Sequence, residues 1–178
     1  MSGDRHDSES LRAHVSSFAG APVLVRDRHL TVLASNPLAR AISPAFAVGV
    51  NLARYAFVDA AGHAGNDGWD AATTQIAAML RESLDRHRED GPFRRIVGEL
   101  SAMSASFSEA WAAEAAPARQ GEATFLGTAV GELRLVYHEE WVDDTHAEAL
   151  MLLFGADSEA EAKLTTLASI VGNGRITE

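Results

Sequence analysis

The densest group of side chains that could bind a metal or move a proton lies between residues 138 and 146. Its members are two histidines and four carboxylates: His138, Glu139, Glu140, Asp143, Asp144 and His146. Imidazole and carboxylate groups are ligands of first-row metals. However, the histidines lack the helical spacing of the metalloprotease signature, and a charge-rich turn between two strands gives the same pattern. We therefore expect a solvated turn here and no metal site.

Nucleophilic catalysis also lacks a candidate. Four serines crowd one stretch of the chain: Ser101, Ser104, Ser106 and Ser108. They have no nucleophile-elbow motif and no histidine close by in sequence, so we expect them to cap helices.

The glycines between residues 62 and 68 follow no predicted strand and precede no lysine, unlike a phosphate-binding loop. The other histidines lie in polar segments, where surface positions are expected: His6, His14, His29, His63 and His87. We predict no catalytic residue, no cofactor and no enzymatic activity.

The charge balance argues against direct binding to nucleic acid. The 178 residues include 15 Lys and Arg against 25 Asp and Glu, a formal net charge of −10, whereas DNA binding needs clustered positive charge. The chain has no cysteine, which excludes thiolate sites and fits a reducing compartment. No stretch approaches the roughly 18 apolar residues of a membrane span. We expect a cytoplasmic protein that does not contact a membrane.

The elements that must position any site begin with a hairpin. Apolar, β-branched runs at 23–25 and 30–33 flank a polar turn, which predicts two paired strands. An amphipathic segment at 11–18 precedes them. Asn36 before a proline predicts a capped short helix through residue 42, and Asn51 predicts another through Phe57. The glycine-rich stretch 62–68 is typical of a loop.

Helical periodicity dominates the middle of the chain. Apolar residues recur at three- and four-residue spacing over 69–88 and again from 93. Ser104 predicts the cap of a further helix, on which Phe107 and Trp111 share one face; we expect that face to lie buried against the sheet. Alternating or continuous apolar runs at 124–127, 130–137 and 149–155 then predict strands, and Ser158 predicts the cap of a last helix.

This order predicts an α+β fold of PAS-like type. Two strands, several helices and three strands form a five-stranded antiparallel sheet with helices packed on one face and flanking N- and C-terminal helices. We divide the chain into an N-terminal helical segment at 1–19, a PAS-like ligand-binding domain at 20–155, and a C-terminal helix and tail at 156–178.

An ordered series of short motifs spans residues 20–155. It includes the segment Asn51-Leu52-Ala53-Arg54-Tyr55-Ala56-Phe57, then Trp69, Leu80-Arg81, the stretch Gly98-Glu99-Leu100-Ser101-Ala102-Met103-Ser104, Phe107 and Trp111, and finally Val130-Gly131-Glu132-Leu133 with Tyr137. This series resembles the ligand-binding domain of MmyB-like transcription regulators. The resemblance implies a PAS-like module of a bacterial regulator, joined in the family to an XRE-type helix-turn-helix and responsive to a small molecule; one member carries a fatty acid.

The chain departs from that family in three places. There is no room for a helix-turn-helix before Leu11, so any DNA contact is expected to come through a domain absent from this chain. Leu126, Gly127, Thr128 and Ala129 stand where the family has a basic residue and His-Pro. Residues 114–116 replace an Asp-Val pair that the family often has after Trp111. These changes favour a less polar pocket mouth or a different ligand.

Two functions fit these observations. The first is a small-molecule sensor, in which a fatty-acid-like or other apolar or amphipathic metabolite shifts conformation or dimerisation. The second is a ligand-free PAS-like module for homodimerisation or protein interaction, with a solid interior. A cavity of several hundred cubic ångströms would separate them. The residues expected to contact a ligand are Arg54, Phe57, Ile76, Leu80, Phe107, Trp111, Phe125, Leu135, Tyr137 and Met151. Arg54 would bind an acidic head group; pairing with Asp59 or another surface carboxylate is the alternative.

Overall fold

The computed structural model describes residues 3–59, 67–87 and 89–174. The strands are β1 (Val23–Asp27), β2 (Val32–Ser35), β3 (Gln120–Thr128), β4 (Gly131–Trp141) and β5 (Glu148–Gly155). The helices are α1 (Gly3–Ser17), α2 (Pro37–Ile42), η1 (Pro44–Phe46), α3 (Leu52–Arg54), η2 (Tyr55–Asp59), α4 (Asp67–Arg86), α5 (Gly91–Met103), α6 (Ala105–Ala112) and α7 (Ser158–Gly174). Most of the predicted loop at 62–68 lies outside the described residues, although 67 and 68 begin α4.

The five strands form one antiparallel sheet in the order β2-β1-β5-β4-β3. This arrangement confirms the predicted α+β, PAS-like architecture. The first hairpin is closed by Asp27, whose Oδ1 accepts hydrogen bonds of 2.8 Å from the backbone N–H groups of His29 and Thr31. Leu30 lies in this turn at a φ of 68°, so the second strand begins at Val32, two residues later than predicted.

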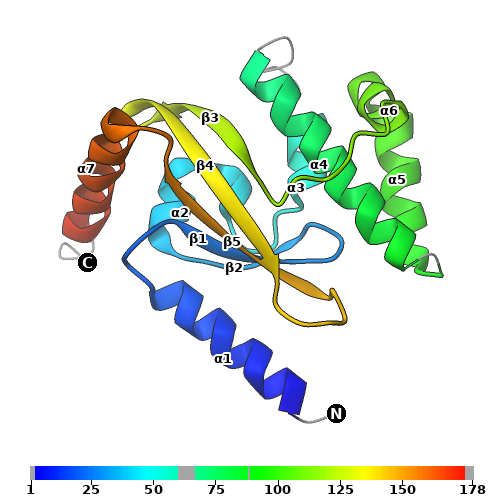
Figure 1. The fold of residues 1–178 in the computed structure, drawn as a ribbon, viewed down its shortest axis with the longest axis horizontal. Helices are drawn as coiled ribbons and strands as arrows, with labels where there is room; N and C mark the ends of the chain where they lie inside the picture. Colours follow the sequence, from blue (N-terminus) through cyan, green and yellow to red (C-terminus); the bar gives the residue numbers. More distant parts are fainter. Residues whose placement is uncertain (1–2, 60–66, 88, 175–178) are drawn as a thin grey trace.

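The two faces of the sheet are covered differently. Leu133, Leu135 and Tyr137 alternate with more exposed residues along β4, and their side chains belong to the large core beneath α2, α3 and α4. On the opposite face, Val15 of α1 packs into a smaller apolar cluster with β1 and β2. In Figure 1, α1 lies apart from the other helices and α7 lies at the far end of the sheet. The flanking helices are therefore placed as predicted.

Side-chain caps start several helices where the sequence predicts them. Asn36 Oδ1 accepts from Ala39 N at 2.9 Å to begin α2, and Ser104 Oγ accepts from Phe107 N at 3.2 Å to begin α6. The predicted cap of α7 is wrong. Asp157, one residue earlier than Ser158, accepts from the backbone N–H of Ala160 at 2.9 Å.

Three further expectations need correction. Strand β4 continues through Trp141, so the charged segment at 138–146 is a solvated turn only in its second half, and Glu139 is 1% exposed. His29 and His87 do not lie free on the surface. His29 Nε2 is 3.1 Å from Asp90 Oδ2, and the ring of His87 stacks parallel to Phe93 with its Nε2 buried. The side chains of His6 and His63 lie outside the described residues.

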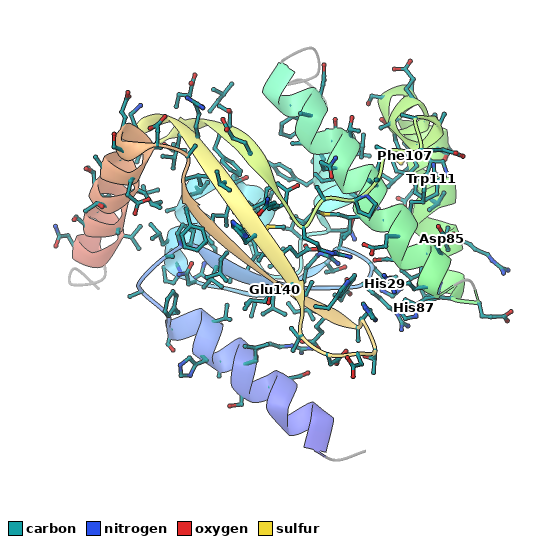
Figure 2. All side chains as sticks on the ribbon, viewed as in Figure 1. His29, Asp85, His87, Phe107, Trp111 and Glu140 are labelled. Atoms are coloured by element: carbon teal, nitrogen blue, oxygen red, sulfur yellow. The ribbon has the colours of Figure 1, made fainter. Side chains whose placement is uncertain are left out.

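Helix α6 packs on α4 and α5 rather than on the sheet. Figure 2 shows Phe107 and Trp111 on α6, beside α4. The four-residue spacing does place the two rings together, with centroids 5.4 Å apart. The expectation that this face lies against the sheet is wrong, because α4 occupies the space between α6 and the strands.

Candidate ligand-binding cavity

A cavity of about 970 Å³ lies between the helices and the sheet. Its walls come from α2 and η1 on one flank, α4 on the other and β3 along its length, and residues of β4 and β5 form its floor. Ligand pockets usually span roughly 300–1,000 Å³. The volume therefore suits a small molecule and is far larger than the voids of a close-packed interior.

Apolar side chains make most of the cavity wall. Phe46 of η1 and Phe125 of β3 meet edge to face, with ring centroids 5.6 Å apart. Ile76 projects from α4, and Met151 and Leu153 come from β5. Such a wall binds a hydrocarbon segment by removing it from water.

Polar side chains are a minority of the lining, and they include the carboxylates Asp70 and Glu122. Most of these polar groups already have partners. Gln75 Oε1 accepts from Ala118 N at 2.9 Å, which joins α4 to the chain entering β3. Among the described residues that line the cavity, Arg40 has the one cationic side chain. It is exposed and donates to Ser35 O and Ser35 Oγ, and the described residues offer it no ion pair.

Tyr137 differs from these polar residues. Its side chain lines the cavity floor and is 8% exposed, yet its buried hydroxyl has no hydrogen-bond partner among the described residues. Burial, and secondarily the negative charge of Glu139, raises the pKa of the Tyr137 phenol. The hydroxyl therefore stays protonated at neutral pH and can donate a hydrogen bond.

A buried ion network adjoins this end of the cavity. Arg26 and Glu139, both fully buried, form a bidentate pair at 2.5 and 2.8 Å. Arg119 pairs with Glu139 at 3.0 Å and with Glu82 of α4 at 2.5 Å. The ring of Trp141 has the guanidinium of Arg26 4.9 Å from its centroid and that of Arg119 5.0 Å from it. The network links β1, β4 and α4, and each of the two arginines has a carboxylate partner in it.

The structure brings four of the ten predicted site residues together around the cavity: Ile76, Phe125, Tyr137 and Met151. Four others lie in the core outside the lining, each at most 2% exposed: Phe57, Leu80, Phe107 and Leu135. Trp111 is half-buried on α6 beneath the guanidinium of Arg81, 4.4 Å from the ring centroid. Arg54 is half-exposed and pairs with Glu99 at 2.5 Å, not with Asp59.

Sequence reasoning missed the flank formed by α2 and η1. Arg40, Ile42 and Phe46 all line the cavity, but the short segments that begin at Pro37 and Pro44 are not long enough for a periodicity that would mark an inner face. Glu139 was also missed. The available signal was its place two residues after Tyr137 and four after Leu135, because alternate residues of a strand share a face.

Comparison of the sequence with known protein families finds a match. The family model described as the MmyB-like transcription regulator ligand binding domain matches residues 8–167. No protein with a curated description matches the chain. Within the described ranges, no helix is long and apolar enough to cross a membrane.

Proposed function

The chain belongs to the MmyB-like transcription regulator ligand-binding domain family, and from that premise we propose that it senses a small apolar or amphipathic molecule held in the cavity between α2, α4 and β3. The observation that carries this proposal is the cavity itself, about 970 Å³ with mainly apolar walls. A domain serving only as an interaction module would gain stability by filling such a space, because voids cost packing energy.

We propose that four residues contact the apolar part of the ligand: Phe46, Ile76, Phe125 and Met151. They lie on η1, α4, β3 and β5 respectively, so one ligand touches elements on both flanks and on the floor. A ligand can shift a conformational equilibrium only by binding one state better than another. Contacts that bridge α4 and η1 supply this difference, because they change whenever the two flanks move relative to each other.

If the ligand is fatty-acid-like, its carboxylate is proposed to lie near Arg40. A carboxylate accepts charge-assisted hydrogen bonds from a guanidinium, and Arg40 is the cationic residue of the lining. DNA contact is proposed to come through a separate helix-turn-helix domain, as in the family, because a net charge of −10 opposes binding to phosphates. Such a regulator would act in the bacterial cytoplasm.

The proposal is tested by native mass spectrometry and thermal shift with decanoate and 1-dodecanol. The informative variant is Ala123→Phe, since Ala123 is a half-buried lining residue of β3 and a phenyl group there occupies the cavity. Ala162→Phe, on the exposed face of α7, is the matched control. We expect binding by wild type and Ala162→Phe, and none by Ala123→Phe. Absence of binding and thermal shift in wild type, together with a stable dimer, would favour the ligand-free interaction module instead.

A further inference from the structure

The Tyr137 hydroxyl is the polar atom of the cavity that most needs a partner. Other buried side-chain atoms without partners belong to Ser83, His87 and Trp141, and none of these residues lines the cavity. A buried donor left unpaired costs stability, so native proteins rarely keep one without a reason. Tyr137 lines a space large enough for a ligand, and although its hydroxyl oxygen is itself covered, a ligand that displaces the groups over it can supply the missing acceptor.

Gly121 makes room for this hydroxyl. It is opposite Tyr137 in the β3–β4 register, and a Cβ at position 121 would lie 2.7 Å from Tyr137 Oη. Both residues line the cavity. The phenol therefore lies against the backbone of β3 in a place that only glycine leaves open, and its hydroxyl is covered within the cavity wall.

The charges around Tyr137 favour an uncharged acceptor. Glu139, two residues along the same face of β4, carries a negative charge that raises the Tyr137 pKa, and Glu122, next to Gly121, is a second carboxylate of the lining. The cations of that region, Arg26 and Arg119, are already bound to carboxylates. An anionic group beside Tyr137 would therefore meet a carboxylate without gaining a cation.

The lining cation lies toward the other end of the cavity. Arg40 is on α2, next to η1, whose Phe46 contacts Phe125. Phe125 is four residues along β3 from Gly121, a span of about 13 Å at roughly 3.3 Å per residue. The cavity thus has one end at Tyr137, where the donor is neutral, and a second end along β3, bordered by the aromatic rings of Phe46 and Phe125 and by Arg40.

We infer that Tyr137 Oη donates a hydrogen bond to an uncharged acceptor oxygen, of the ketone, ester or alcohol class, at one end of an elongated ligand whose apolar part lies along β3 toward Phe46 and Phe125. This inference rests on the proposed function and adds a chemical class and an orientation. It makes Tyr137 a determinant of ligand specificity, since a matched hydrocarbon loses the hydrogen bond and leaves the phenol unpaired.

The test uses three probes that differ only in their terminal group: 2-undecanone, 2-methyl-1-undecene and decanoate. Their affinities are measured by displacement of the neutral dye N-phenyl-1-naphthylamine. We expect wild type to bind the ketone roughly three- to tenfold more tightly than the alkene, the range of one neutral hydrogen bond. Tyr137→Phe should abolish the preference for the ketone over the alkene, because the ketone oxygen then has no donor, and should leave the affinity for decanoate unchanged. Gly121→Ala, which displaces the hydroxyl without removing it, should also reduce the preference for the ketone.

The matched control is Tyr55→Phe. It makes the same change in the second tyrosine of the chain, which also lines the cavity but is more exposed, and it should keep the preference for the ketone. The ligand-free Tyr137→Phe protein should unfold at the temperature of wild type or above it, because the change breaks no hydrogen bond and removes a buried, unpaired donor. A lower unfolding temperature would reveal a structural partner and overturn the inference.

Three other results would also overturn it, and they can be told apart. Equal binding of ketone and alkene by wild type removes the role of Tyr137 while the sensing cavity stands. A larger loss for decanoate than for the ketone in Tyr137→Phe means that the hydroxyl binds an anion. Failure of wild type to bind the dye or any probe removes the proposed function itself.

Discussion

Two arginines are candidates to bind the carboxylate of an acidic ligand. Arg54 is engaged by Glu99 outside the cavity lining, whereas Arg40 lines the cavity and has no ion pair among the described residues. We predict that Arg40→Ala weakens decanoate binding roughly fivefold, as expected for one solvent-exposed charge-assisted hydrogen bond. Arg54→Ala should leave it unchanged. Titration of both variants by dye displacement decides the matter, and a loss confined to Arg54→Ala would contradict this assignment.

Glu139 is the residue on which the buried ion network depends. It accepts from both Arg26 and Arg119, so Glu139→Gln leaves the fully buried Arg26 without a counter-charge. We predict a loss of about 3–5 kcal/mol in the free energy of unfolding, the usual cost of breaking a buried pair, measured by urea denaturation. Glu99→Gln, which breaks a half-exposed pair, should leave the midpoint almost unchanged. Equal effects would mean that Arg26 is reached by water.

The sequence predicts the chemistry of single residues only in part. It correctly identified Asn36, Asn51 and Ser104 as helix caps, because a cap depends on neighbours within three residues. It misjudged Glu139, since the length of β4 depends on pairing with β5 far along the chain. Tyr137 was expected at a ligand site. Whether its hydroxyl finds a partner, however, depends on neighbours in β3 and β5 as well as in β4, and these strands are paired only in the folded sheet.

At the scale of elements, α6 gives the clearest test of packing. Phe107 is fully buried and meets Phe57 edge to face, with centroids 5.1 Å apart, whereas Trp111 is half-buried under Arg81. We predict that Phe107→Ala costs about 3–5 kcal/mol and Trp111→Ala only about 1–2 kcal/mol, measured by urea unfolding. A larger cost for Trp111→Ala would place its ring, rather than Phe107, at the centre of the contact between α6 and α4.

The strands and helices themselves were largely predictable, whereas their neighbours were not. Periodicity distinguishes helix from strand over a short window, which explains why all five strands and the long helix α4 were found. It does not tell which element a buried face meets. The α6 face was expected against the sheet and packs on α4 and α5 instead, and the α2–η1 flank of the cavity gave too short a pattern to be assigned.

At the scale of the whole molecule, the formal net charge of −10 opposes binding to DNA. We predict no sequence-specific DNA binding by this chain alone, because it would have to bring net negative charge against phosphates. A gel-shift assay at physiological salt, with a candidate operator and a scrambled duplex, checks this. A specific shift would show that a local basic surface outweighs the overall charge.

The fold of the whole molecule followed from the order of its elements, but the position of its cavity did not. Core and pocket residues have the same apolar periodicity, so Leu80 and Leu135 seemed as suitable for a ligand as Ile76 and Met151. The structure separates them, with the first pair in the core and the second at the cavity. Only the packing of α2, α4 and β3 around a common space creates that difference.

The most direct test of the account is a measurement of intermolecular nuclear Overhauser effects between bound decanoate or 2-undecanone and the methyl groups of the protein. Ile76 and Met151 line the cavity, while Leu80 and Leu135 are buried outside its lining. We predict effects from the ligand chain to Ile76 and Met151, and none to Leu80 and Leu135. A bound ligand whose effects appear only at methyl groups outside the cavity lining would contradict the account.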